Sequence, residues 1–127
     1  MNLNRFKEMS GEIVIQPMLD YMKYFEEDGE ECPYTTEHVK QCETLLNGYL
    51  SALAALAAPT DEAIMSLVEE VILALNELNN DTEDSLIETE AREALWQVIQ
   101  ESAVECGLSD ECIEANEGDI TGEWRDW

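Results

Sequence analysis

Positively charged residues are the scarcest feature of this 127-residue chain. It has six Lys and Arg residues against 30 Asp and Glu residues, a formal net charge of −24, and no Lys or Arg between Lys40 and Arg92. A surface of this sign repels the phosphates of nucleic acids and of anionic membranes, so we expect neither as a partner. The same charge attracts cationic molecules and keeps a protein dissolved. The composition therefore favours a basic protein as the partner.

Histidine and glycine are too sparse for most catalytic motifs. The one histidine, His38, offers no Ser–His or Cys–His arrangement, and the six glycines are scattered rather than gathered in a phosphate-binding loop. A metal site would need His38 with Cys32 and Cys42, and the cysteine spacings do not match zinc modules. We expect instead that Cys42 is a small core residue, that His38 lies on a helix surface, and that the thiols are free. We predict no catalytic residue, no metal site and no cofactor.

Long apolar runs are missing as well. No stretch of eighteen apolar residues occurs, which predicts that the chain has no transmembrane helix. The stretch that follows the first ten residues is short and is interrupted by Glu12, Pro17 and Asp20, unlike the apolar region of a signal peptide. We therefore expect a cytoplasmic protein.

The apolar residues that are present recur at helical spacing. A hydrophobic fraction of 45% is ordinary for a folded protein, so the acidity does not indicate disorder. The clearest helix covers residues 64–78, where Leu73 and Ala74 widen the apolar face and suggest a central position. Another apolar stripe runs over residues 39–56, and a third over residues 91–104.

Capping residues and breakers divide these helices. We expect a short helix over Arg5–Met9, capped by Asn2 or Asn4 and ended at Ser10-Gly11, with Pro17 in the first turn of the next helix. Gly29 and Pro33 bracket a loop. The later helix starts are expected at Thr35 or Thr36, at Thr60, at Ser85 or Thr89, and at Ser109, with a stop at Gly107.

The pattern as a whole predicts an all-α fold. We expect one domain over residues 1–127: an antiparallel bundle of about four principal helices with a short C-terminal helical appendage. The ending DITGEWRDW supplies Ile120, Trp124 and Trp127, which either fold back onto the bundle or, for the two tryptophans, form an anchor patch for a partner. Arg92 is expected to pair with an acid such as Glu77.

Paired carboxylates raise the alternative of a metal-dependent all-α hydrolase. Glu90 with Glu93, and Glu111 with Glu114, have the spacing that places both side chains on one helix face. Four such Glu pairs occur, no more than random placement of the 22 glutamates gives. A calcium loop that starts at Asn79 fails at its sixth position, where Asp84 replaces the required glycine.

Two stretches carry a resemblance to known sequences. VILALNELNNDTEDSLIETEAREALWQVI and the ending DITGEWRDW resemble segments of small acidic bacterial proteins that are known only as domains of unknown function. The resemblance covers about the C-terminal half and is carried by Asn76, Glu77, Leu78, Asn79, Ile87, Glu88, Thr89 and Arg92. It implies a bacterial helical protein and brings no catalytic residues. Some such proteins are similar to immunity proteins of toxin systems.

The leading hypothesis is a non-enzymatic acidic module that binds a basic protein partner, as an inhibitor or immunity protein. Residues 64–127 hold 18 of the acidic and two of the basic side chains, a charge of −16 beside an intact core pattern. A solubility-adapted domain is a further alternative, and the broad apolar faces leave a homodimer open. The residues predicted to contact the partner are Asp81, Glu83, Asp84, Glu88, Glu90, Glu111, Glu114, Glu117, Trp124 and Trp127.

Overall fold

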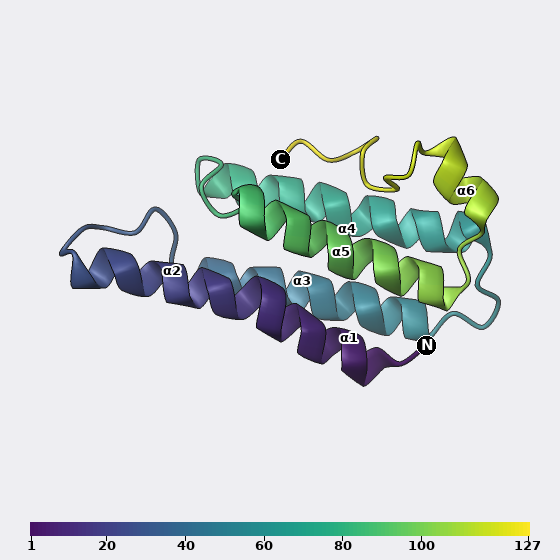
Figure 1. Ribbon diagram of the computed structural model, residues 1–127, viewed down its shortest axis with the longest axis horizontal. Coiled ribbons are helices and arrows are strands. Elements are labelled where there is room, and N and C mark those ends of the chain that lie inside the picture. Colours follow the sequence, from purple (N-terminus) through teal and green to yellow (C-terminus); the bar gives the residue numbers. More distant parts are fainter.

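The structure, a computed structural model of all 127 residues, is built from helices alone. In chain order these are α1 (Leu3–Ser10), η1 (Gly11–Ile15), α2 (Gln16–Glu27), α3 (Thr36–Ala54), α4 (Asp61–Asp81), α5 (Thr89–Cys106) and α6 (Asp110–Ala115). The α1–η1–α2 segment, α3, α4 and α5 run side by side with alternating direction, and α6 with the C-terminal tail covers one side of α4 and α5 (Figure 1). The predicted all-α bundle with a short C-terminal helix is confirmed.

The N-terminal helix continues where the sequence predicted a stop. Asn2 caps α1 as expected, but Gly11 keeps helical dihedral angles and the chain passes through one π-helical stretch into α2. There the N–H of Gln16 bonds to the carbonyl of Gly11, five residues back, just before Pro17, which has no N–H to donate. A glycine within a helix costs about 0.5–1 kcal/mol of stability. At Gly11 this cost is outweighed by the free energy gained when the continuous helix buries one apolar face. The buried residues of this face are Phe6, Ser10, Val14, Ile15 and Met18.

The central helix of the bundle is α3. The sequence predicted that the helix over residues 64–78, which is α4, would be central. Helix α3 packs against α1, η1, α2, α4 and α5, whereas α4 packs mainly on α3 and α5. Leu73 is correspondingly 46% exposed and does not widen the core face of α4 as predicted. Thr35 caps α3 reciprocally with His38, and Thr60 caps α4, both at predicted positions. His38 thus lies at a helix start, and Cys42 is fully buried in the core.

The C-terminal part closes the bundle. Gly107, with a φ of +120°, ends α5 where predicted, and Ser109 caps α6 through the N–H of Cys112. Beyond α6 the tail turns back along the bundle and buries Ile120 completely. None of the helices combines the length and the apolar composition that crossing a bilayer requires.

Candidate functional site

The acidic residues predicted to bind a partner fall into two separate groups. All eight carboxylates are exposed. Those of residues 81–90 lie at the end of α4 and the start of α5, while those of residues 111–117 lie at α6, beside the start of α4 (Figure 1). The 21 residues of α4 separate the two groups by about 30 Å. The fold therefore places the two halves of the contact surface predicted from the sequence at opposite ends of the bundle.

The loop between α4 and α5 is held by two polar side chains at the end of α4, Asn79 and Thr82. Asn79 is buried, and its Oδ1 accepts a hydrogen bond of 2.9 Å from the N–H of Ile87. The Thr82 hydroxyl donates to the carbonyl of Asn79 and accepts from the N–H of Leu86. These bonds bury Leu86 and Ile87, so the predicted cap at Ser85 does not form. The loop is a fixed turn rather than a flexible tether.

The carboxylates of Glu83, Asp84 and Glu88 lie on the surface of this turn. Glu83 and Asp84 have φ angles of 55° and 62°, a left-handed conformation that is rare for residues with a side chain. Glu88 occupies the N-cap position of α5 without a side-chain hydrogen bond, so neither it nor Thr89, the other predicted cap, satisfies the first amides. Its carboxylate consequently remains free for other contacts.

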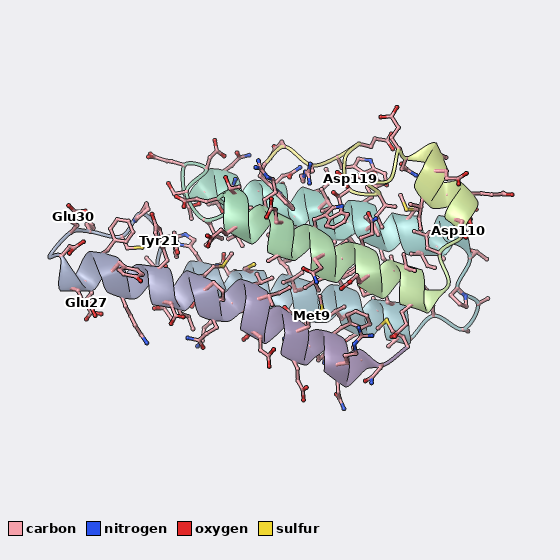
Figure 2. The ribbon with its side chains drawn as sticks, in the orientation of Figure 1. Met9, Tyr21, Glu27, Glu30, Asp110 and Asp119 are labelled. Carbon is pink, nitrogen blue, oxygen red and sulfur yellow. The ribbon has the colours of Figure 1, made fainter.

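Aromatic side chains of α2 and of the loop that follows α2 lie opposite the loop between α4 and α5. The Tyr34 hydroxyl donates to the carbonyl of Met18 at 3.1 Å, which fastens the loop after α2 onto α2 itself. The ring of Tyr21 stacks on Tyr34 and meets Phe25 edge-on. Burial raises the pKa of Tyr34, and the nearby carboxylate of Glu88 raises it further, so this phenol stays protonated. Tyr21 lies at the end of the molecule away from Asp110 of α6 (Figure 2).

These two sides enclose a hollow, which we name the tyrosine groove. It has a volume of about 920 Å³ and lies between α2 and the start of α5. One wall comes from η1, α2 and Tyr34, and the other from residues 85–92. Of the predicted partner-binding residues, Glu88 and Glu90 line it. The residues lining it are Ile13, Val14, Pro17, Met18, Asp20, Tyr21, Tyr24, Tyr34, Ser85, Leu86, Ile87, Glu88, Thr89, Glu90, Ala91 and Arg92.

Few of the carboxylates are neutralised within the molecule. Three ion pairs occur, and their acidic members are Asp20, Glu105 and Asp119. The predicted pairing of Arg92 with an acid such as Glu77 is wrong, because no carboxylate lies within 4 Å of its guanidinium. Arg92 lines the tyrosine groove instead, four residues after Glu88 on α5.

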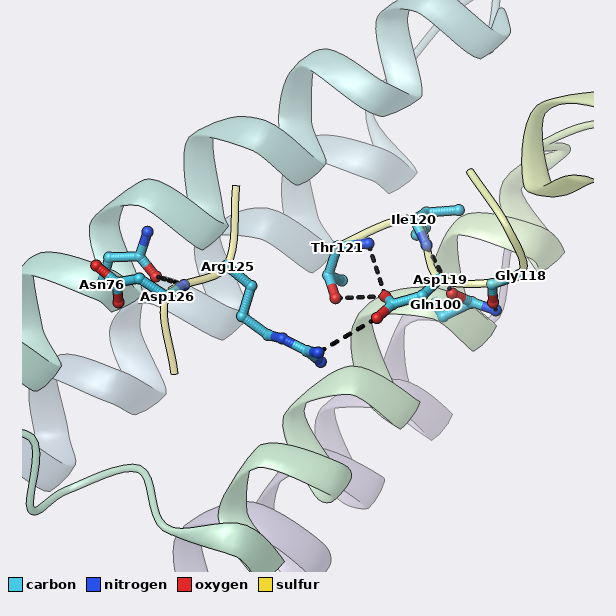
Figure 3. A network of polar contacts seen from close by, with 8 residues as sticks. All are labelled: Asn76, Gln100, Gly118, Asp119, Ile120, Thr121, Arg125 and Asp126. Atoms are coloured by element: carbon cyan, nitrogen blue, oxygen red, sulfur yellow. Dashed lines mark hydrogen bonds and ion pairs between the residues drawn. The ribbon is translucent and has the colours of Figure 1, made fainter. Parts of the chain in front are cut away.

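The tail tryptophans take part in closing the bundle. The amide of Asn76 on α4 donates to the carbonyl of Trp124 and accepts from the N–H of Asp126. On α5, Gln100 donates to the carbonyl of Gly118 and accepts from the N–H of Ile120 (Figure 3). Trp124 and Trp127 are half-buried against the core. Of the two alternatives that the sequence left, the structure shows the tail folded back.

The paired carboxylates do not assemble into a metal centre. No three His, Cys, Asp or Glu side chains are arranged to hold a metal ion. Glu90 and Glu93, like Glu111 and Glu114, are exposed on the surfaces of their helices. The four cysteines are free, and burial raises the pKa of Cys42 to about 12.

Sequence reasoning missed the tyrosines. Tyr21, Tyr24 and Tyr34 come from a helix and a loop that the sequence treated separately from the acidic loop after α4. A faint signal exists, because Tyr21 and Tyr24 stand three residues apart on one helix face. That spacing says nothing of what the face meets in space.

Comparison with known proteins adds no relative: no family model, curated protein or solved structure matches the chain.

Proposed function

We propose that the protein is a non-enzymatic interaction module whose acidic surface binds a basic protein partner, acting as an inhibitor or immunity protein. The observation that supports this is the surplus of free carboxylates: 30 acidic side chains share three ion pairs, and none of the eight predicted contact carboxylates is in them. Free negative charge on a folded surface accelerates encounter with a positively charged surface and excludes negatively charged competitors.

The contact surface we propose is the acidic loop together with the tyrosine groove. The loop residues Asp81, Glu83 and Asp84 lie beside Glu88 and Glu90, which line the groove. No residue of α6 lines the tyrosine groove. Interfaces draw most of their energy from a few desolvated apolar or aromatic anchors surrounded by polar groups, and only the loop end offers both.

The test is an affinity pull-down from the lysate of the cells that produce the protein, at low and high salt, with bound proteins identified by mass spectrometry. Two variants are compared with the wild type. One neutralises the loop by changing Asp81, Glu83, Asp84, Glu88 and Glu90 to the matching amides. The other changes Glu111, Glu114 and Glu117 to Gln.

One basic protein recovered stoichiometrically by the wild type and by the α6 variant, but lost in high salt and with the loop variant, is the expected result. Because charge pairs at an interface steer association, we expect the loop variant to bind at least about tenfold more weakly at low salt. Recovery of no basic protein, or equal recovery by both variants, contradicts the proposal.

A further inference from the structure

The tyrosine groove presents the two aromatic side chains of the chain that are most exposed. Five large hydrophobic side chains are exposed in the whole chain, and two of them, Tyr21 and Tyr24, line this one groove. Tyr24 is 65% exposed, the largest value of the five. Tyrosine anchors interfaces because it offers a large rigid face and one polar tip for little loss of conformational freedom.

The rim of the groove is negative on both walls. Asp20 lies on α2, Glu88 lies at the N-cap position of α5, and Glu90 lies in the first turn of α5. Lys23 approaches Asp20 at 3.9 Å, but both side chains are exposed, so this pair neutralises little of the charge. Arg92 is the one cation among the lining residues. The lining therefore carries three negative charges and one positive charge around an apolar floor.

Hydrogen bonds within the chain hold each wall of the groove. Tyr34 is bonded to the carbonyl of Met18 on one side, and Asn79 holds Ile87 on the other. A preformed groove binds without the ordering cost that a flexible surface carries. None of the 127 residues fills it, since those that reach it form its walls. A second copy of the chain, with its own charge of −24, is repelled from a negative rim.

Together these features point to one occupant. We infer that the groove binds an amphipathic basic segment of the partner protein, with apolar side chains against Tyr21 and Tyr24 and with Lys or Arg side chains at Asp20, Glu88 and Glu90. Cations also lie favourably over the faces of tyrosine rings. This inference rests on the proposed function and adds the chemistry of the segment that is recognised.

Fluorescence anisotropy with labelled synthetic peptides tests it. The probe is an amphipathic peptide of leucine and lysine, and the comparison peptides are a lysine–glycine peptide of the same charge and a leucine–glutamate peptide of the opposite charge. The groove variant carries Tyr21→Ala and Tyr24→Ala. Its matched control carries Leu73→Ala and Val104→Ala, which remove exposed apolar side chains elsewhere. A variant with Tyr24→Ala alone changes the most exposed tyrosine and keeps the stack of Tyr21 on Tyr34.

The wild type is expected to bind the leucine–lysine peptide more tightly than the lysine–glycine peptide, and the leucine–glutamate peptide least. The groove variant is expected to lose about tenfold or more in affinity for the leucine–lysine peptide, as truncation of aromatic anchors does, with Tyr24→Ala changing affinity in the same direction. The control variant and the lysine–glycine affinity stay unchanged.

The inference is overturned if the control variant loses as much affinity as the groove variant, or if the leucine–lysine peptide binds no better than the lysine–glycine peptide. Analytical sedimentation gives a further check. A dimer that forms with the wild type but not with the groove variant would assign the groove to a second copy of the chain, and this result also overturns the inference. Equal, salt-sensitive binding of both lysine-containing peptides leaves the acidic-module proposal standing and removes only the groove, so the two failures are distinguishable.

Discussion

At the residue scale, Asn79 is expected to contribute more to the stability of the fold than Asn80 next to it. Its side chain is buried and holds the N–H of Ile87, whereas the adjacent Asn80 is exposed. Asn79→Ala leaves a buried amide without its acceptor, which costs about 1–3 kcal/mol. Asn80→Ala makes the same change in helix propensity and is expected to leave stability nearly unchanged. Urea unfolding of both variants checks this, and equal midpoints would contradict the role given to Asn79.

We expect the four cysteines to differ in reactivity because they differ in burial. Cys42 is fully buried and its pKa is raised to about 12, while the other three thiols are partly exposed. The thiolate is the reactive form, so Cys42 is expected to escape a thiol reagent at pH 8 in the folded protein. All four thiols should react once urea unfolds the chain. Mass spectrometry of the labelled peptides distinguishes Cys42 from the rest, and rapid native labelling of Cys42 would show the core to be open.

At the element scale, two glycines are expected to respond in opposite directions. Gly48 lies within α3 with open space at its missing Cβ, so Gly48→Ala removes only the entropic cost of a helical glycine and raises stability by about 0.5–1 kcal/mol. Gly107 ends α5 at a φ of +120°, a conformation that strains other residues. Gly107→Ala is expected to lower stability by about 1–3 kcal/mol. Thermal unfolding followed by circular dichroism compares them, and a shared direction would be inconsistent with these backbone roles.

The junction between α4 and α6 depends on one carboxylate. Asp61 accepts hydrogen bonds from the N–H and the hydroxyl of Ser109, at 2.9 and 2.5 Å, and these bonds lower its pKa. A carboxylate whose pKa is lower in the folded state contributes stability above its unfolded pKa, and the contribution is lost as the pH falls through the folded value. Asp61→Asn should therefore destabilise the protein at pH 7 and lose that difference in strong acid.

Urea unfolding of the wild type and of Asp61→Asn between pH 7 and pH 2 measures this effect. Asp110→Asn, at an exposed carboxylate of α6 that accepts no hydrogen bond from Ser109, serves as the control. A gap between wild type and Asp61→Asn that stays constant over the range would assign the effect to something other than ionisation.

Helix boundaries were predictable where local chemistry sets them. The caps at Thr35, Thr60 and Ser109 were found because each side chain bonds to a backbone N–H three residues on. The helix that continues through Gly11 was missed because its cause is distant: α3 and α5 cover the face that the continuation buries. The start of α5 was displaced for a similar reason, since Asn79 reaches across eight residues to Ile87.

The candidate site was predictable only in part. Counting charges located the acidic loop, because exposure of carboxylates follows from their chemistry. The separation of that loop from α6 depends on the direction in which α4 runs, and the groove depends on how α2 meets the start of α5. Both are tertiary relations that no local pattern encodes.

At the scale of the whole molecule, the charge works against the fold that carries it. A net charge of −24 produces self-repulsion, and three exposed or partly exposed ion pairs offset little of it. Raising NaCl from about 0.01 M to about 1 M shortens the screening length from about 30 Å to about 3 Å. We expect the unfolding temperature to rise by several degrees over this range, as scanning calorimetry measures. The variant with a neutralised loop should rise less, and a fall with salt would mean that attractive pairs dominate.

The docked tail has an optical consequence. It carries two of the three tryptophans, and the indole N–H groups of Trp127 and of Trp96 on α5 are both buried without a hydrogen-bond partner. Indoles held away from water fluoresce at shorter wavelength than indoles in water, whereas circular dichroism in the far ultraviolet reports on the helices. A red shift of the emission at constant ellipticity would therefore signal release of the tail from an intact bundle. The emission wavelength of the tryptophans therefore indicates whether the C-terminal segment is docked, without an added label.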